Sequence, residues 1–180
     1  MQRFASLFVV PCALACLFTA PSWAASDGSL GSTSVGSFDL TLDLLDAVRI
    51  SGMQDVALGN ISVGSLTPGG AQTASVSDIC VFSNGLSGQY TLAVSTTSGS
   101  LALDGGTSTT IPYAFEWDDG TNSESVTATG TMATNFLAAR ILACLLDRTA
   151  TLTLTIQNDD LIAADAGSYS QQITLTVSPL

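Results

Sequence analysis

The chain has 180 residues, with fifteen acidic residues against four basic ones and no histidine. This length is enough for one domain. The formal net charge of −11 repels nucleic acid phosphates and anionic lipid headgroups, which excludes nucleic-acid binding and membrane-surface binding.

The first 24 residues have the three-part layout of a secretory signal peptide. Arg3 gives a positive start, residues 4–18 are almost continuously apolar, and small residues precede a cleavage site after Ala24. A membrane anchor is one alternative, although the apolar run is short for a bilayer span. A lipoprotein modified at Cys16 is another, although the residues before it match such a site poorly. We therefore expect an exported protein.

The next two segments differ in pattern. Residues 25–36 are rich in Ser, Gly and Thr, which predicts a flexible leader without a core of its own. Residues 37–44 alternate polar with apolar side chains, which is typical of a strand with one apolar face. The apolar members are Phe38, Leu40, Leu42 and Leu44.

From residue 46 onward, short apolar alternations separated by turn signals predict an all-β fold. Threonine and β-branched residues dominate these segments, as pleated surfaces favour, and turns recur about every ten residues, as in a β-sandwich. The tight-turn signal at residues 83–85 is an example. Strands are predicted near residues 56–58, 61–63, 76–82, 90–94, 101–103, 111–117, 126–132, 152–156 and 169–177, while residues 136–146 fit helix or strand equally.

Two cysteines, Cys80 and Cys144, remain after removal of the signal peptide. Export implies an oxidising compartment, where an even pair predicts a disulfide. Such a bridge closes a loop of about 64 residues and stabilises the fold by about 4 kcal/mol. Two free buried thiols are the alternative.

The sequence offers little for catalysis. Without histidine the commonest general base and the commonest metal ligand are missing. Four acids cluster around Gly120, but they bracket a turn, so we expect a solvated hairpin end instead of the facing carboxylates of a glycosidase. These acids are Glu116, Asp118, Asp119 and Glu124. We expect no catalytic residue, no cofactor and no enzyme activity.

Two further groups suggest ligands, but each has an ordinary explanation. Calcium favours oxygen-rich loops such as residues 158–165, yet the spacing is not that of an EF-hand and fits turn chemistry. Tyr113 and Trp117 could form a sugar platform, yet they alternate in step with Ile111 and Phe115, which favours a place in the core. The acidic loop holds Asn158, Asp159, Asp160 and Asp165.

The segment at residues 37–44 is the feature that points to a function. An amphipathic strand on a tether can pair with the open edge of another sheet, where backbone hydrogen bonds supply affinity and alternate side chains fill pockets. Four anchors at about 1.5–3 kcal/mol each give a gross burial term of about 6–12 kcal/mol, before ordering costs. The pattern equally fits the first strand of the chain's own sandwich.

Several motifs together resemble the spore coat protein U-like domain, which is shared with subunits of the archaic chaperone–usher pili of Gram-negative bacteria. The resemblance extends from about residue 37 to the end, and the order and spacing of the motifs carry it. They are ICVFSNG at residues 79–85 with YTL at 90–92, IPY at 111–113 leading to Trp117, TLTLTI at 151–156, AGSY at 166–169 and ITLTV at 173–177.

The resemblance implies an immunoglobulin-like β-sandwich that lacks one strand. In this family a periplasmic chaperone lends that strand, and the N-terminal segment of the next subunit later replaces it. On this sequence, residues 37–45 would be the donor segment, with the four apolar residues as its anchors, and residues 46–180 the pilin-like sandwich. The implied partners are a periplasmic chaperone, an outer-membrane usher and neighbouring subunits. The implied location is the periplasm in transit, then the cell surface in a pilus, or outside the cell.

One departure from the family pattern concerns the disulfide. Many shaft subunits carry a cysteine just after the donor segment, where this chain has residues 49–51 (RIS), so the partner of Cys80 must be Cys144. The position of the subunit, shaft or minor, stays open. Two alternatives to a pilus subunit also stay open: a secreted coat or biofilm β-domain with a complete fold, and a small carbohydrate-binding adhesin module that uses Tyr113 and Trp117.

Overall fold

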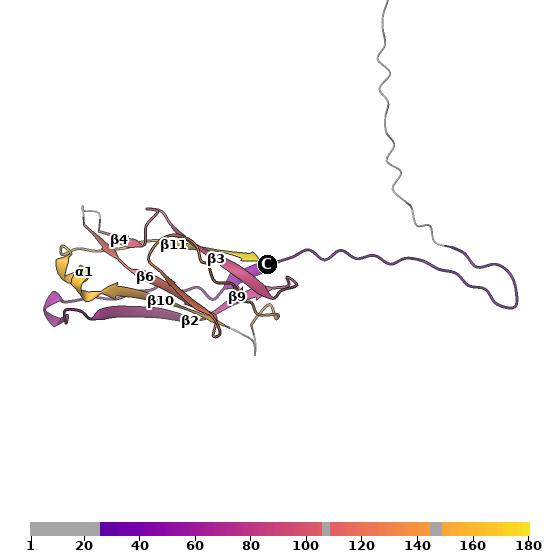
Figure 1. Cartoon of the computed structure of the whole chain (residues 1–180), viewed down its shortest axis with the longest axis horizontal. Helices are drawn as coiled ribbons and strands as arrows, with labels where there is room; N and C mark the ends of the chain where they lie inside the picture. Colours follow the sequence, from indigo (N-terminus) through magenta and orange to yellow (C-terminus); the bar gives the residue numbers. More distant parts are fainter. Residues whose placement is uncertain (1–25, 106–108, 145–148) are drawn as a thin grey trace, which may run out of the picture. The chain divides into compact units, whose positions relative to one another are not determined.

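The alternating apolar residues after residue 45 form two packed antiparallel sheets, a β-sandwich of immunoglobulin-like type (Figure 1). The computed structural model describes residues 26–105, 109–144 and 149–180. The predicted signal peptide lies outside these residues. The chain divides into two units, residues 1–44 and residues 45–180. The all-β prediction is confirmed.

The first sheet has the strand order β1-β2-β10-β6-β7. Its strands are β1 (Val48–Ser51), β2 (Ala71–Ser83), β10 (Ala150–Gln157), β6 (Ala114–Asp118) and β7 (Ser123–Val126).

The second sheet has the order β11-β3-β8, and a further short strand, β9, also pairs with β3. Its strands are β11 (Ile173–Pro179), β3 (Gln89–Thr96), β8 (Gly130–Thr131) and β9 (Phe136–Leu137). A small hairpin is made of β4 (Ala102–Asp104) and β5 (Thr110–Pro112), and the helical elements are η1 (Val63–Ser65) and α1 (Asn158–Ala163).

Side chains from both sheets fill the core between them. In β6, Phe115 and Trp117 point inward, and in β3 Tyr90 does so, each with no exposed surface. Trp117 Nε1 donates to the Tyr90 hydroxyl over 2.9 Å, which gives the indole N–H a partner within the core. The buried cluster comprises Val76, Ile79, Val81, Tyr90, Leu92, Val94, Leu101, Ile111, Tyr113, Phe115, Trp117, Met132, Phe136, Ala138, Ala150, Leu152 and Ile156.

A β-bulge in β2 divides that strand between two partners. Asp78 has a φ of 62°, and the register with β10 shifts between Val76 and Ile79. Asp tolerates this left-handed conformation better than most residues. Before the bulge β2 pairs with β10, directly after it Ile79 still pairs with Ala150 of β10, and from Cys80 to Ser83 β2 pairs with β1. Gly52, at the end of β1, has a φ of 86°, and a Cβ there would lie 2.9 Å from the Asp78 carbonyl oxygen.

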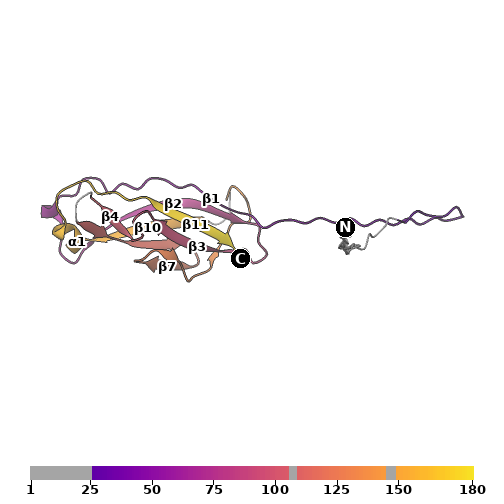
Figure 2. The same cartoon turned by 90° about the horizontal axis from the view of Figure 1, so that it is seen from above.

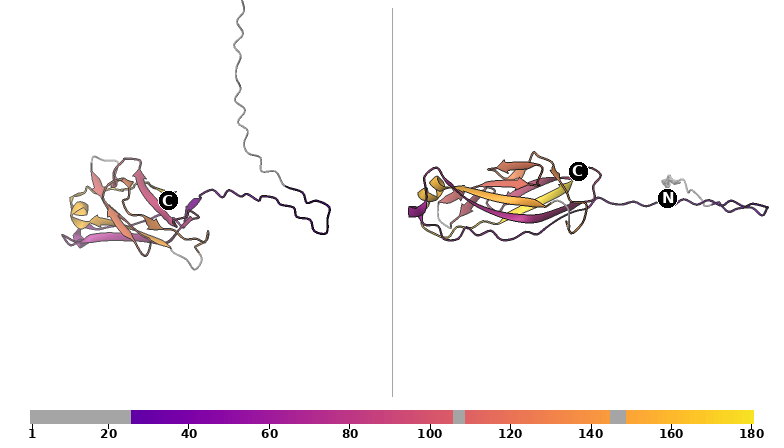
Figure 3. Two further views of the ribbon diagram at one scale, coloured as in Figure 1. Left: turned by 45° about the vertical axis from the view of Figure 1, so that its right-hand side comes forward. Right: turned by 90° about the horizontal axis from the view of Figure 1, so that it is seen from below.

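The two ends of the sandwich carry different loops (Figure 2). At the end we call proximal, the turn after β2 lies beside the C-terminal residue and the start of β1. At the opposite, distal end, the loop between η1 and β2 lies beside α1, where Gly69 N donates to Asp159. The views in Figure 3 show β11 ending at the C-terminus.

The structure differs from the sequence-based expectations in several places. Residues 56–58 and 61–63 were predicted as strands, but they are not in strands, because no described backbone pairs with residues 53–61 and η1 begins at Val63. Residues 111–117, predicted as one strand, split into β5 and β6, and Tyr113 between them donates its N–H to Leu101 instead of to a ladder. The predicted acidic loop after β10 begins as the short helix α1. For residues 136–146, where helix and strand were equally expected, the structure has β9 at its start, followed by bends and turns up to residue 144, and residues 145–146 lie outside the described ranges.

Candidate functional site

The edge of the second sheet is open along β11. This strand pairs with β3 from Ile173 to Pro179, and its other edge has no strand partner within the described ranges. Its inward side chains, Ile173, Leu175 and Val177, pack against the core but stay half-buried. Free backbone groups beside a row of incompletely covered apolar side chains form a template for another strand.

The strand β1 of the first sheet lies next to β11, and an irregular stretch of chain follows β1. β1 contacts β11, although the two strands do not pair. After β1, residues 53–61 form no strand and no backbone hydrogen bond with any described residue. Val56, Leu58 and Ile61 of this stretch are half-buried, and Val56 and Leu58 pack against the core. Both β11 and residues 53–61 thus have apolar side chains that pack against the core and backbone groups without a strand partner on at least one side among the described residues.

The unit before residue 45 presents a row of exposed apolar side chains. Ser26 and Ser37 exchange backbone hydrogen bonds of 2.9 and 3.0 Å. Residues 38–44, which we call the arm, are not in a strand, because no described backbone pairs with them. A β-strand exists only with a partner, so the predicted strand is absent in the isolated chain. Phe38, Leu40, Leu42 and Leu44 are 80%, 89%, 86% and 80% exposed.

Residues 45–47, which we call the root, are bound to the turn after β2. The Asn84 side chain donates from Nδ2 to the Leu45 carbonyl oxygen over 2.9 Å, and it accepts the Ala47 N–H at Oδ1. The Asn84 backbone N–H donates to the Ala47 carbonyl oxygen over 3.2 Å. These contacts extend the β1–β2 pairing, which otherwise begins at Val48 and Ser83.

The end of β11 is held at the same proximal turn. Ser87 Oγ donates to the Leu180 carbonyl oxygen over 2.6 Å, and Leu180 N donates to Gln89 O over 3.1 Å. Arg140 Nη1 donates to Gly85 O over 2.6 Å, which fixes the turn from the other side. The start of β1 and the end of β11 are therefore both tied to one loop.

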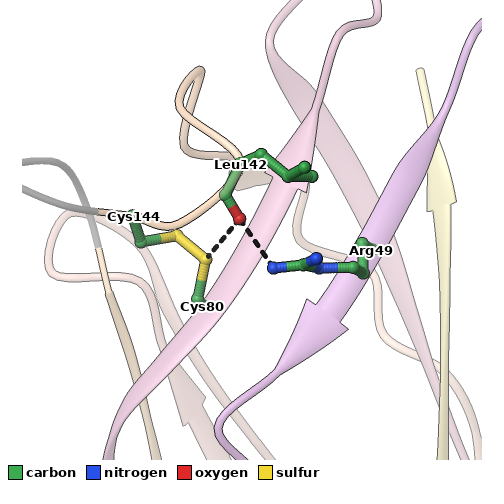
Figure 4. Close-up of a disulfide and its surroundings, with 4 residues drawn as sticks. All are labelled: Arg49, Cys80, Leu142 and Cys144. Atoms are coloured by element: carbon green, nitrogen blue, oxygen red, sulfur yellow. Dashed lines mark hydrogen bonds between the residues drawn. A yellow bond between two sulfur atoms is a disulfide. The ribbon is translucent and has the colours of Figure 1, made fainter.

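The predicted disulfide between Cys80 and Cys144 is present, with the Cα atoms 5.7 Å apart (Figure 4). It ties β2 to the loop after β9. The Leu142 carbonyl oxygen beside it accepts a hydrogen bond of 2.8 Å from Arg49 Nη2 and lies 3.8 Å from the Cys80 sulfur. Because Arg49 belongs to β1, this loop also braces the strand next to the open edge.

The acidic turn between β6 and β7 is exposed at Asp118, Gly120 and Thr121, as the sequence predicts. The prediction is wrong for Asp119, which is only 3% exposed. Its carboxylate accepts the backbone N–H groups of Thr121, Asn122 and Leu137 and the side-chain amide of Asn122. Asp119 is therefore a structural group that joins the β6–β7 turn to β9.

The sugar-platform interpretation is also wrong, because both aromatic residues are buried. Trp117 is 0% and Tyr113 is 5% exposed. Burial raises the pKa of Tyr113 to about 12, so its hydroxyl stays protonated and donates to Gln171 Oε1. The described residues include no group of three or more Cys, Asp or Glu side chains placed to hold a metal ion. Within them, no helix has the length and apolar character to cross a membrane.

Sequence reasoning located the apolar row of the arm and both cysteines, but it did not locate the open edge of β11. The alternation in residues 173–177 was visible, but it does not indicate which edge of the strand lacks a partner. Asn84 was predicted only as a turn residue. Its hydrogen bonds to Ala47 and Leu45 join residues far apart in the chain, so no local pattern in the sequence indicates them.

No protein-family model matches the chain, and a comparison with curated proteins finds no match. The likeness to the spore coat protein U-like domain therefore stays a prediction. Among solved structures, the chain is similar to one from a study described as "Chaperone-tip adhesin complex is vital for synergistic activation of CFA/I fimbriae biogenesis", with a TM-score of 0.48 and 17% identity. The match covers 74% of this chain and 41% of that chain. The chain spans less than half of that protein, and the likeness is too distant to assign a function.

Proposed function

We propose that this protein is a structural subunit of a cell-surface pilus and that it polymerises by donor-strand exchange. The observation that carries this proposal is the open, half-covered edge of β11 in a chain that also has an unpaired, exposed apolar arm. The arm of one copy would add a strand along β11 of the next copy. The mechanism is non-catalytic assembly.

The arm and the edge match in period and in length. Side chains that alternate along a strand face one side at every second residue. The inward row of β11 runs from Ile173 to Val177, and the apolar row of the arm runs from Phe38 to Leu44. At about 3.3 Å per residue, the arm residues 38–44 extend over about 20 Å, as do the seven residues of β11.

The energetics favour pairing over solvent exposure. The four arm anchors are at least 80% exposed, so their burial contributes about 1.5–3 kcal/mol each before ordering costs. The unpaired backbone of β11 gains a partner in the same step. An interface between an arm and a distant edge is heterologous, does not close, and therefore builds a fibre.

The same exposed edge explains why such a chain would need help before assembly. An open edge with apolar side chains is an aggregation hazard in a free subunit. We infer that a periplasmic chaperone covers β11 during transit and that an outer-membrane usher delivers the subunit to the surface.

A gel of periplasmic extract tests the proposal, with samples in SDS left unboiled or boiled. We expect the parent chain to give a ladder that collapses to monomer on boiling. Leu42→Asp places a charge in the apolar row and should reduce the ladder at least tenfold, because one anchor is worth about 1.5–3 kcal/mol. Thr41→Asp, which places the same charge on the opposite face, is the matched control and should keep the ladder.

If the parent runs as a monomer in the unboiled sample as well as in the boiled one, the sandwich needs no strand from another copy. The chain would then be a secreted coat or biofilm β-domain. Equal loss of the ladder in both variants would show that the apolar row is not what binds.

A further inference from the structure

We propose that Asn84 determines which copy receives the arm, by holding the root in a direction that prevents the arm from folding back onto its own β11. This inference rests on the proposed function and adds a specificity-determining residue to it. Without such a device, an arm joined to the same domain would have a large advantage over an arm from another copy, because its effective concentration is in the millimolar range.

The first step is the chemistry of the contact. An asparagine amide can donate and accept at once. Asn84 donates to the Leu45 carbonyl oxygen and accepts from the Ala47 N–H, two groups that lie on one side of the chain when residue 46 is extended. The side chain thus takes the place of a peptide unit of a neighbouring strand.

The second step is the direction that this contact imposes. The β1–β2 ladder begins at Val48 and Ser83, and Asn84 follows directly on the β2 side. Its backbone N–H also bonds to Ala47 O. The root is therefore held as an extended continuation of β1.

The third step compares the strand directions. β1 starts at the proximal end, and β11 finishes there, since Leu180 is bonded to Ser87 and Gln89. An arm lying on its own β11 would have to run toward the proximal end and then reverse into β1. Only residues 45–47 are available for this reversal. A hairpin loop of three residues is possible, but the residues of such a loop adopt turn conformations. Asn84 instead holds residues 45–47 in an extended conformation. An arm that pairs with β11 of another copy does not have to reverse its direction before β1.

A cross-linking experiment separates the two routes. Asp43→Cys and Thr176→Cys place one thiol on the polar face of the arm and one on the exposed face of β11. The native cysteines are joined to each other and do not react with a bismaleimide. In the parent background we expect cross-links between copies only. In the Asn84→Ala background we expect cross-linked monomer, identified by mass, to rise at least tenfold. Asn60→Ala, an exposed asparagine outside the root, is the matched control and should behave as the parent.

A second variant covers the case in which Asn84→Ala does not fold. An insertion of Gly-Ser-Gly-Ser between Leu44 and Leu45 keeps the Asn84 contacts but gives the arm room to reverse, so it should also yield cross-linked monomer. Cross-links between copies only, in a folded Asn84→Ala variant or in the insertion variant, would overturn the role of Asn84 and leave the proposed function standing. Abundant cross-linked monomer in the parent would overturn the role of Asn84 as well. If the parent gives neither cross-links between copies nor cross-linked monomer, both the role of Asn84 and the proposed function are wrong.

Discussion

At the scale of single residues, Asp119 shows how one buried carboxylate organises a turn. Backbone N–H groups in tight turns often lack partners, and a buried N–H without one is costly. Asp119 accepts three such groups, and one of them belongs to Leu137 in the other sheet. The side chain therefore couples the local turn to the packing of the two sheets.

Asp119→Ala should lower the free energy of unfolding by about 3 kcal/mol, because three partly buried N–H groups lose their acceptor. Urea unfolding followed by Trp117 fluorescence measures this, with each variant in the same assembly state. Asp118→Ala is the control, since the Asp118 side chain is exposed and its carboxylate accepts Gly120 N within the same turn. Its cost should stay below about 1 kcal/mol. Similar losses in the two variants would contradict the structural role of Asp119.

At the scale of elements, the sheets are joined by polar contacts as well as by the core. Glu124 of β7 accepts the backbone N–H groups of Ala133 and Thr134 in the loop between β8 and β9, over 3.0 and 2.6 Å. Burial raises the pKa of Glu124, but the hydrogen bonds from Ala133 and Thr134 outweigh it, so the pKa lies below its usual value. The bonded form is the carboxylate.

This contact has a definite pH dependence. A carboxylate whose pKa is lowered in the folded state stabilises the fold above its unfolded pKa, which is about 4.3 for Glu, and loses that contribution as the pH falls through the folded pKa. Glu124→Gln should therefore melt below the parent at pH 7, and the gap should narrow as the pH falls below about 4. Glu116→Gln on the adjacent strand is the control. A gap for Glu124→Gln that stays constant from pH 7 to pH 3 would be evidence against this mechanism.

At the scale of the whole molecule, the disulfide connects distant parts of the chain. Cys80 and Cys144 have a sequence separation of 64, and the segment between them includes β3, β6 and β9, so the bridge encloses much of the core. It also braces the loop whose Leu142 carbonyl binds Arg49 of β1. A sandwich with one open edge has less buried surface than a closed one, so this constraint carries a larger share of its stability.

Removal of the bridge should cost about 4 kcal/mol, as expected for a loop of this length. The measurement is urea unfolding of the oxidised protein beside the Cys80→Ser, Cys144→Ser double variant. Cys80→Ser alone serves as a comparison, because it loses the same bridge and should lose the same free energy. An unchanged midpoint in the double variant would show that the unfolded chain gains little freedom when the bridge is absent.

Much of this architecture follows from the sequence alone, because strand patterning is local. The alternation of Leu152 and Ile156 with threonines, or of Phe115 with Trp117 around Glu116, predicts strands and inward faces directly. The signal pattern predicts export, and counting the cysteines outside it predicts the pairing of Cys80 with Cys144, which the structure contains. The arm at residues 38–44 is likewise visible as an amphipathic segment after a Ser- and Gly-rich leader.

Other features were decided by contacts between residues far apart in the chain. No local pattern shows that β11 lacks a partner on one edge, that Asp119 is buried, or that Asn84 binds a root 37 residues earlier. A pattern of period two records which face of a strand is apolar but not which neighbours its backbone finds. Local patterning therefore predicts most of the strands and the arm, whereas the place where an added strand could pair depends on the folded arrangement, because an edge exists only once every other strand has been placed.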